Sequence, residues 1–178
     1  MTRTDTVATG QTTLLRRLGW GLVATLFLIP LAGRLATSEV GWTLSDFAVW
    51  AAMLSFAGLL GEGMLRTFRP GAVLTGGMLA VGAGFLLVWI NLAVGFLGNE
   101  HNPLNQTYFA MLTAVLIIAA VSRFRLRVMA WLMVGCAVVQ ATIPVIGRQA
   151  WGFEWVATGI FCAIWLVAAA LFARATRA

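Results

Sequence analysis

Residues 71–98 read GAVLTGGMLAVGAGFLLVWINLAVGFLG, a run that contains no charged side chain. A helix needs about 20 mostly apolar residues to cross the hydrocarbon core of a bilayer. This run is longer than that, so it predicts a membrane-spanning helix that tilts or whose last turn stands outside the bilayer. The stretch therefore indicates a membrane protein.

The composition of the whole chain agrees with a membrane location. Hydrophobic residues make up 61% of its 178 residues and charged residues 10%, whereas soluble domains contain about half and about a quarter. A chain this apolar is excluded from the soluble globular and the disordered classes. The 12 basic residues, all arginine, lie in small groups between apolar runs, so we expect no nucleic-acid partner.

Five further apolar runs lie on either side of residues 71–98. We therefore predict an all-α polytopic membrane protein with a single bundle of six transmembrane helices in residues 14–178, preceded by a disordered, threonine-rich cytoplasmic tail in residues 1–13. An alternative for the N-terminal run is a signal peptide cleaved near Ala36. The predicted spans are Leu18–Ala36, Leu44–Leu65, Gly71–Gly98, Leu104–Val121, Val128–Gly147 and Trp155–Ala173.

The arginines orient this bundle, because basic residues favour the cytoplasmic side of a membrane. Counted on alternate sides of the predicted spans, ten of the 12 arginines fall on the side of the two termini, and only Arg34 and Arg148 fall on the other. Both termini are therefore predicted to be cytoplasmic (N-in/C-in). We expect aromatic residues at the opposite interface, among them Trp42, Tyr108 and Trp155.

Two of the predicted spans end in similar segments, since residues 29–34 read IPLAGR and residues 143–148 read IPVIGR. An arginine pair also follows each consecutive pair of spans. Three repeated hairpins would account for both features. The alternative is that orientation alone places the arginines and that proline is common in membrane helices.

Small residues indicate where helices pack in lipid, because they let two backbones approach closely. Gly76, Ala80 and Gly84 recur at four-residue spacing, so we expect the third span to be the central helix. We expect the protein to associate through such faces, either with another copy of itself or with a partner membrane protein.

The most distinctive polar stretch is residues 91–106, NLAVGFLGNEHNPLNQ. Asn91 lies seven residues inside Gly98, roughly 10 Å below the predicted helix end, and an amide at that depth needs partners. On a continuous helix Asn91, Gly95 and Asn99 would form one polar stripe.

This stretch is open to two interpretations. In the first it is the outer mouth of a ligand or ion site, since carboxylate and amide oxygens are hard ligands. In the second it is structural. Asn99 and Asn102 then end one helix, Asn105 caps the next, and Asn91 bonds to a neighbouring helix. The candidate residues are Asn91, Asn99, Glu100, Asn102 and Asn105.

Glu62 is an acidic residue well inside a predicted span, and intramembrane carboxylates are functional candidates. It shares a helical face with Ser55 and Gly58. Arg66 follows four residues later, in the favourable order for an ion pair on one helix. The alternatives are a local ion pair at the cytoplasmic interface, proton coupling, or contact with an arginine of another helix.

The sequence lacks the motifs of most enzymes. It contains no Gly-rich phosphate loop, nucleophile elbow or paired His-acid metal motif, and one histidine and two separated cysteines are too few for an ordinary zinc site. We expect Cys136 and Cys162 to be free thiols within spans. We therefore predict no catalytic residues, no metal and no cofactor, and keep an enzyme acting on lipid at the interface as a third class.

Residues 91–105 resemble the NLAVGxxGxExNPxN motif of a family of small bacterial six-span inner-membrane proteins of unknown activity. The similarity extends to Trp42–Phe47, Glu62 and Arg123–Arg125, and covers roughly residues 41–127. It implies six spans and a bacterial inner (plasma) membrane location, and it implies no activity. His101 stands where the family has an acid and Leu126 where it has a proline, which weakens any proposal that needs a carboxylate pair in the loop.

Two functions follow from these observations. The first is a structural or accessory membrane protein that associates through helix packing, with the lipid bilayer and other membrane proteins as partners. The alternative is a small transporter or ion-binding protein with a small-molecule or ion ligand. Its outer site would lie in Asn91–Asn105, with Glu62 on the inner side.

Overall fold

The computed structural model describes residues 3–37, 41–99, 101–148 and 152–177, with side chains from Gly10 onward. These ranges are helical, and six of their helices are long and apolar enough to cross a membrane. The prediction of an all-α, six-span membrane protein is confirmed. The elements are α1 (Arg3–Ala36), α2 (Leu44–Thr67), α3 (Ala72–Ala93), the short 3-10 helix η1 (Pro103–Asn105), α4 (Gln106–Val121), α5 (Leu126–Ile146) and α6 (Phe153–Ala175).

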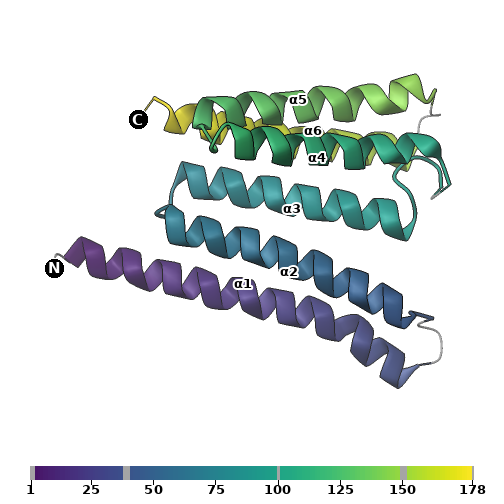
Figure 1. Cartoon of the computed structure of the whole chain (residues 1–178), viewed down its shortest axis with the longest axis horizontal. Coiled ribbons are helices and arrows are strands. Elements are labelled where there is room, and N and C mark those ends of the chain that lie inside the picture. Colours follow the sequence, from purple (N-terminus) through teal and green to yellow (C-terminus); the bar gives the residue numbers. More distant parts are fainter. Residues whose placement is uncertain (1–2, 38–40, 100, 149–151, 178) are drawn as a thin grey trace. The chain divides into compact units, whose positions relative to one another are not determined.

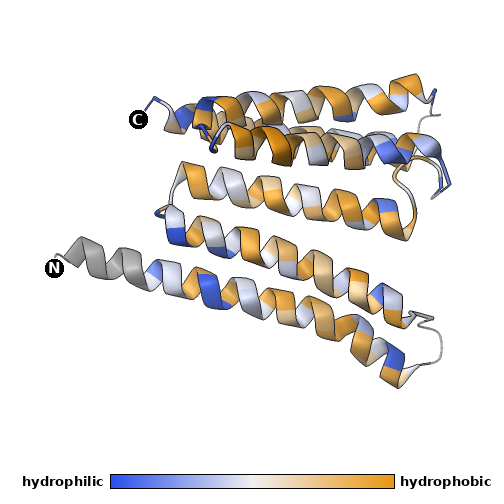
Figure 2. Cartoon of the chain, in the orientation of Figure 1, coloured by the Kyte–Doolittle hydropathy of each residue, from blue (hydrophilic) through white to orange (hydrophobic). Residues whose placement is uncertain are grey.

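The helices follow from the membrane environment. Figure 2 shows apolar residues along the helices and hydrophilic residues gathered near their ends and connections. In lipid, every backbone amide and carbonyl must bond within the protein, which a helix achieves inside one segment. The chain is therefore an integral, multi-pass membrane protein.

The N-terminal helix is longer than predicted. We expected residues 1–13 to be disordered, but α1 begins at Arg3 and continues without a break to Ala36. No proline interrupts residues 3–17, and extending an existing helix is easier than starting a new one. The apolar part of α1 that could cross a membrane begins at Gly10.

The chain divides into two compact units, residues 1–70 with α1 and α2 (unit 1) and residues 71–178 with α3 to α6 (unit 2). The expectation of one six-helix domain in residues 14–178 stays a prediction. Hydropathy predicts which segments enter lipid, but an apolar side chain gains little by leaving lipid for another helix. Hydropathy consequently does not determine which helices pack together.

Unit 2 is a ring of four helices. Within it α3 packs against α4 and α6, and α5 packs against the same two helices (Figure 1). Gly76 of α3 lies against α6, where an added Cβ would be 3.2 Å from Leu171 Cβ, and Gly84 lies against Leu112 of α4. The small residues do mark a packing face of α3, as predicted. However, α3 is one member of the ring rather than its centre.

Candidate functional site

The third span ends five residues earlier than predicted. Its last helical residue is Ala93, and Gly95 and Gly98 have φ angles of 74° and 71°. These left-handed conformations suit glycine, which lacks a Cβ, and they turn the chain out of the helix. The 22 residues of α3 span about 33 Å, which matches a bilayer core without an overhanging turn. The expected helical stripe of Asn91, Gly95 and Asn99 therefore does not form.

The asparagines after α3 bind the loop to itself. Asn105 accepts a hydrogen bond from Leu97 N at 2.9 Å and donates one to Asn99 O at 2.8 Å. Asn102 donates to Leu97 O at 3.1 Å and accepts from Leu104 N at 3.0 Å. Asn99 accepts from His101 N at 2.9 Å. We call Asn99, Asn102 and Asn105 the asparagine clasp, because their side chains close the loop between α3 and α4.

Two apolar side chains anchor the clasp in the core of unit 2. Phe96 and Leu97 are buried. The ring of Phe96 lies 5.0 Å from that of Tyr108 on α4 and 5.6 Å from that of Phe161 on α6. The clasp is thus joined to two buried apolar side chains, of which Phe96 contacts both α4 and α6.

The asparagine side chains bond within the protein, but not in the way that was expected. α3 ends at Ala93, so Asn99 and Asn102 do not end this helix. Asn102 caps η1 with its side chain. Asn105 occupies the cap position of α4, but its side chain makes no capping bond, because it is used within the clasp. Asn91 donates to Leu87 O of its own helix at 2.7 Å, so it does not bond to a neighbouring helix as expected. Glu100 lies outside the described residues.

Asn91 is buried, and its Oδ1 has no hydrogen-bond partner in the described part of the chain. Three other buried side chains of unit 2 share this property and come from three further helices. They are Tyr108, Gln140 and Thr158, and both amide atoms of Gln140 are unpartnered. We call these three the buried polar layer. Trp165 Nε1, further along α6, is also unpartnered among the described residues.

Two members of the layer, Gln140 and Thr158, lie at about the same level of unit 2. Cys162 Sγ of α6 donates to Ala137 O of α5 at 3.4 Å. Because α5 and α6 run in opposite directions, Gln140 and Thr158 both lie about one turn from this contact toward the clasp. Thr158 is also one turn from Phe161, which packs on Phe96.

The sequence analysis missed the buried polar layer. Gln140 is an amide in the middle of a span, and the rule that singled out Asn91 would have found it. Tyr108 was expected at the membrane interface, but it is only 1% exposed. Its burial depends on Phe96, whose position follows from the loop and not from hydropathy.

Glu62 is the centre of an ion cluster in unit 1. Arg66 Nε lies 2.7 Å from Glu62 Oε1, and Arg16 Nε of α1 lies 3.0 Å from the carboxylate. Trp20 Nε1 donates to Glu62 Oε2 at 3.4 Å. The local ion pair and the contact with an arginine of another helix are therefore both present.

The neighbouring turn of α2 completes this contact. A Cβ added to Gly58 would lie 3.4 Å from the Trp20 ring and from Val23, so the face shared by Gly58 and Glu62 packs on α1. Ser55, which was expected on the same face, is exposed. Glu62 thus joins the two helices of the hairpin.

The described residues contain no group of three His, Cys, Asp or Glu side chains that could hold a metal ion. Cys136 and Cys162 are free thiols, as predicted. No family model, curated protein or solved structure matches this chain. The resemblance of residues 91–105 to a bacterial family consequently stays a prediction.

Proposed function

We propose that this protein is a structural or accessory component of a membrane that associates by helix packing and catalyses no reaction. The asparagine clasp is the observation that carries the proposal. The amides of Asn99, Asn102 and Asn105 bond to the loop's own backbone, which leaves fewer polar atoms to coordinate a ligand.

The surface of α1 supports association with a partner. The most apolar part of this helix has no residue buried inside the protein. Gly19 and Gly21 have no atoms within 4 Å of an added Cβ. Small exposed residues allow close approach of a second helix in lipid. The partners proposed are the lipid bilayer, another copy of the chain, or a different membrane protein.

The test is thermal unfolding of the detergent-purified protein with a panel of ions and polar metabolites, beside Asn99→Ala and Glu100→Gln. A ligand that binds only the folded state stabilises it, by about 2.7 kcal/mol at a hundred times its Kd. We expect no ligand to raise the melting temperature. A shift that disappears in Asn99→Ala or Glu100→Gln would overturn the proposal and establish a site in the loop.

The buried polar layer favours a second candidate, a small transporter or ion-binding protein. Polar atoms buried without partners are costly in an apolar environment, and Tyr108, Gln140 and Thr158 bring them from three helices. Water or a small polar ligand at this level would satisfy them. If the ligand panel finds a stabilising compound whose effect is lost in Gln140→Leu but kept in Asn99→Ala, this second function is supported instead.

The proposed location is the inner membrane of a bacterium, with both termini in the cytoplasm. The support is the asymmetry of the arginines, of which ten of 12 lie on the side of the termini. Fusions of a fluorescent protein and of alkaline phosphatase to Ala178 test the orientation. Fluorescence without phosphatase activity is expected, and the reverse result would contradict the orientation.

A further inference from the structure

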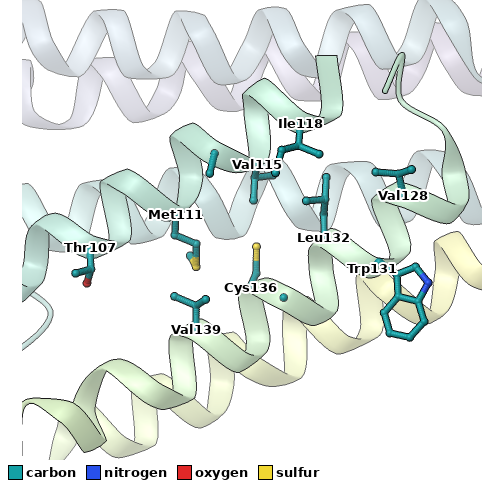
Figure 3. A pocket seen from close by; sticks show the side chains of 11 residues that line it. Thr107, Met111, Val115, Ile118, Val128, Trp131, Leu132, Cys136 and Val139 are labelled. Atoms are coloured by element: carbon teal, nitrogen blue, oxygen red, sulfur yellow. The ribbon is translucent and has the colours of Figure 1, made fainter. Parts of the chain in front are cut away.

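An apolar groove runs along unit 2 between α4 and α5 (Figure 3). Its volume is about 400 Å³, within the range of small-ligand sites. The walls are formed mainly by aliphatic and sulfur-containing side chains, and Thr107 supplies the polar atom at one end. From Thr107 to Ile118 the groove follows α4 for about 16 Å, which is close to half the thickness of a bilayer core.

The other end of the groove is strongly basic. Ile118, Val128 and Trp131 line that end, and the turn that joins α4 to α5 follows directly. Arg123 and Arg125 lie in this turn and Arg127 in the first turn of α5, and all three are exposed. Among the side chains that the structure describes, the ion pairs are those of Glu62, and they do not involve these three arginines.

Charge of one sign dominates this whole end of unit 2. The last turn of α6, which runs antiparallel to α5, brings Arg174, and Arg177 follows it. Glu154, the acidic residue described in unit 2, lies in the first turn of α6 at the opposite end. An anionic group is therefore attracted to the basic end and not to the end near Thr107.

Trp131 indicates where the basic end of the groove, which we call its mouth, lies in the membrane. It is 71% exposed and lines the groove five residues after the start of α5, about one and a half turns along the helix (Figure 3). Tryptophan concentrates where the hydrocarbon meets the headgroups of a bilayer. The groove thus passes from hydrocarbon to the headgroup level where the arginines stand.

We propose that this groove binds an anionic glycerophospholipid, with one acyl chain between α4 and α5 and its phosphate at Arg123, Arg125 and Arg127. The apolar walls match the chain, and the three arginines match the phosphate. A partner helix would fill the groove equally well with apolar atoms, but an anionic lipid also matches the positive charge at the basic end. The site is separate from the clasp and does not depend on the proposed function.

The experiment is native mass spectrometry of the full chain, titrated with phosphatidylglycerol and with phosphatidylcholine of the same acyl chains. The charge variant is Arg123→Gln with Arg127→Gln, and its matched control is Arg174→Gln with Arg177→Gln. Wild type is expected to bind phosphatidylglycerol more tightly. Loss of two arginines at the mouth should weaken that binding about thirtyfold, while the control pair should change it only slightly.

The groove itself is tested with Gly135→Leu. Gly135 lines the groove and has no atoms within 4 Å of an added Cβ, so a larger side chain occupies the groove without displacing the backbone. The matched control is Gly159→Leu on α6, which also has open space around its Cβ and lies outside the groove. If Gly135→Leu cannot be purified, Ala114→Leu on the opposite wall replaces it. We expect the blocked variant to lose both lipids and the control to keep them.

Several results would overturn the proposal. They are equal binding of the two lipids by wild type, equal losses in the two arginine pairs, or unchanged binding in the blocked variant. Displacement of the lipid by glycerol 3-phosphate would show a simple anion site without an acyl chain. A change of Gly135→Leu from dimer to monomer, with lipid binding intact, would assign the groove to a second copy.

Discussion

Replacing Asn105 by leucine should unfold the clasp at a calculable cost. Asn105 is 3% exposed, and its amide bonds to Leu97 N at 2.9 Å and Asn99 O at 2.8 Å. Leu97 is fully buried, so its N–H would be left without a partner, at a cost of about 1–3 kcal/mol. Asn99 is exposed and its carbonyl can recover water, so that bond adds roughly 0.5–1.5 kcal/mol.

The expected total is a loss of about 1.5–4.5 kcal/mol, or a fall in melting temperature of roughly 3–18 °C for a chain of this length. Thermal unfolding in detergent, followed by circular dichroism, measures it. Asn105→Asp keeps the acceptor for Leu97 N and should fall between leucine and wild type. Asn99→Ala is the matched control, since the Asn99 side chain accepts one bond, from His101 N, and should cost less than about 1 kcal/mol.

The reasoning fails if Asn105→Leu is as stable as wild type. It also fails if Asn105→Leu and Asn99→Ala are equally destabilised, because burial of Leu97 would then not control the cost. A variant of normal stability that has lost a ligand effect would instead support the interpretation of this loop as a ligand site.

Three further predictions concern other parts of the fold. Gly76→Leu should destabilise unit 2 by about 1–3 kcal/mol, because a Cβ there already lies 3.2 Å from Leu171 and 3.3 Å from Ala168 O. Gly82→Leu on the same helix, with nothing within 4 Å, should leave the melting temperature unchanged. Glu62→Gln should lower the melting temperature, because Arg16 and Arg66 lose their shared counter-charge. Glu154→Gln is the control variant. An equal effect of both substitutions would contradict a special role for Glu62. Gln140→Leu should raise the free energy of unfolding by about 1–3 kcal/mol, because it removes two buried polar atoms without hydrogen-bond partners. A loss of stability would mean that water or a ligand forms hydrogen bonds with Gln140 in the membrane.

Much of the local structure could be read from residues that are close together in the chain. The ends of α2, α4, α5 and α6 fall within about two residues of the predicted spans, because apolar runs of spanning length have no other stable form in lipid. The Glu62–Arg66 pair also followed from spacing alone, since residues four apart share a helical face. The early end of α3 was missed, because the left-handed glycines lie in an otherwise apolar run that hydropathy treats as continuous.

For the candidate site, too, local features could be predicted from the sequence and the bonding partners could not. That Asn91 lies within a helix at depth and needs a hydrogen-bond partner could be predicted from residue type and position, whereas the expected capping residue was Asn105 and the side chain that caps is that of Asn102. The partners could not, since Asn105 bonds to Leu97 and Asn99, six to eight residues away, and the choice depends on how the loop folds. Gln140 and Thr158 lie at about the same level only because α5 and α6 pack in one register.

The sequence by itself determined that this is a membrane protein, which segments are apolar enough to span the bilayer, and how the arginines are distributed among the connections. Each of these properties is a sum over local composition. The tertiary structure alone decided that the helices divide into two units, that the asparagines close a loop, and that a basic-mouthed groove lies between α4 and α5. Helix association in lipid depends on close packing and on individual hydrogen bonds. Such contacts are specified by geometry between distant residues, which hydropathy does not contain.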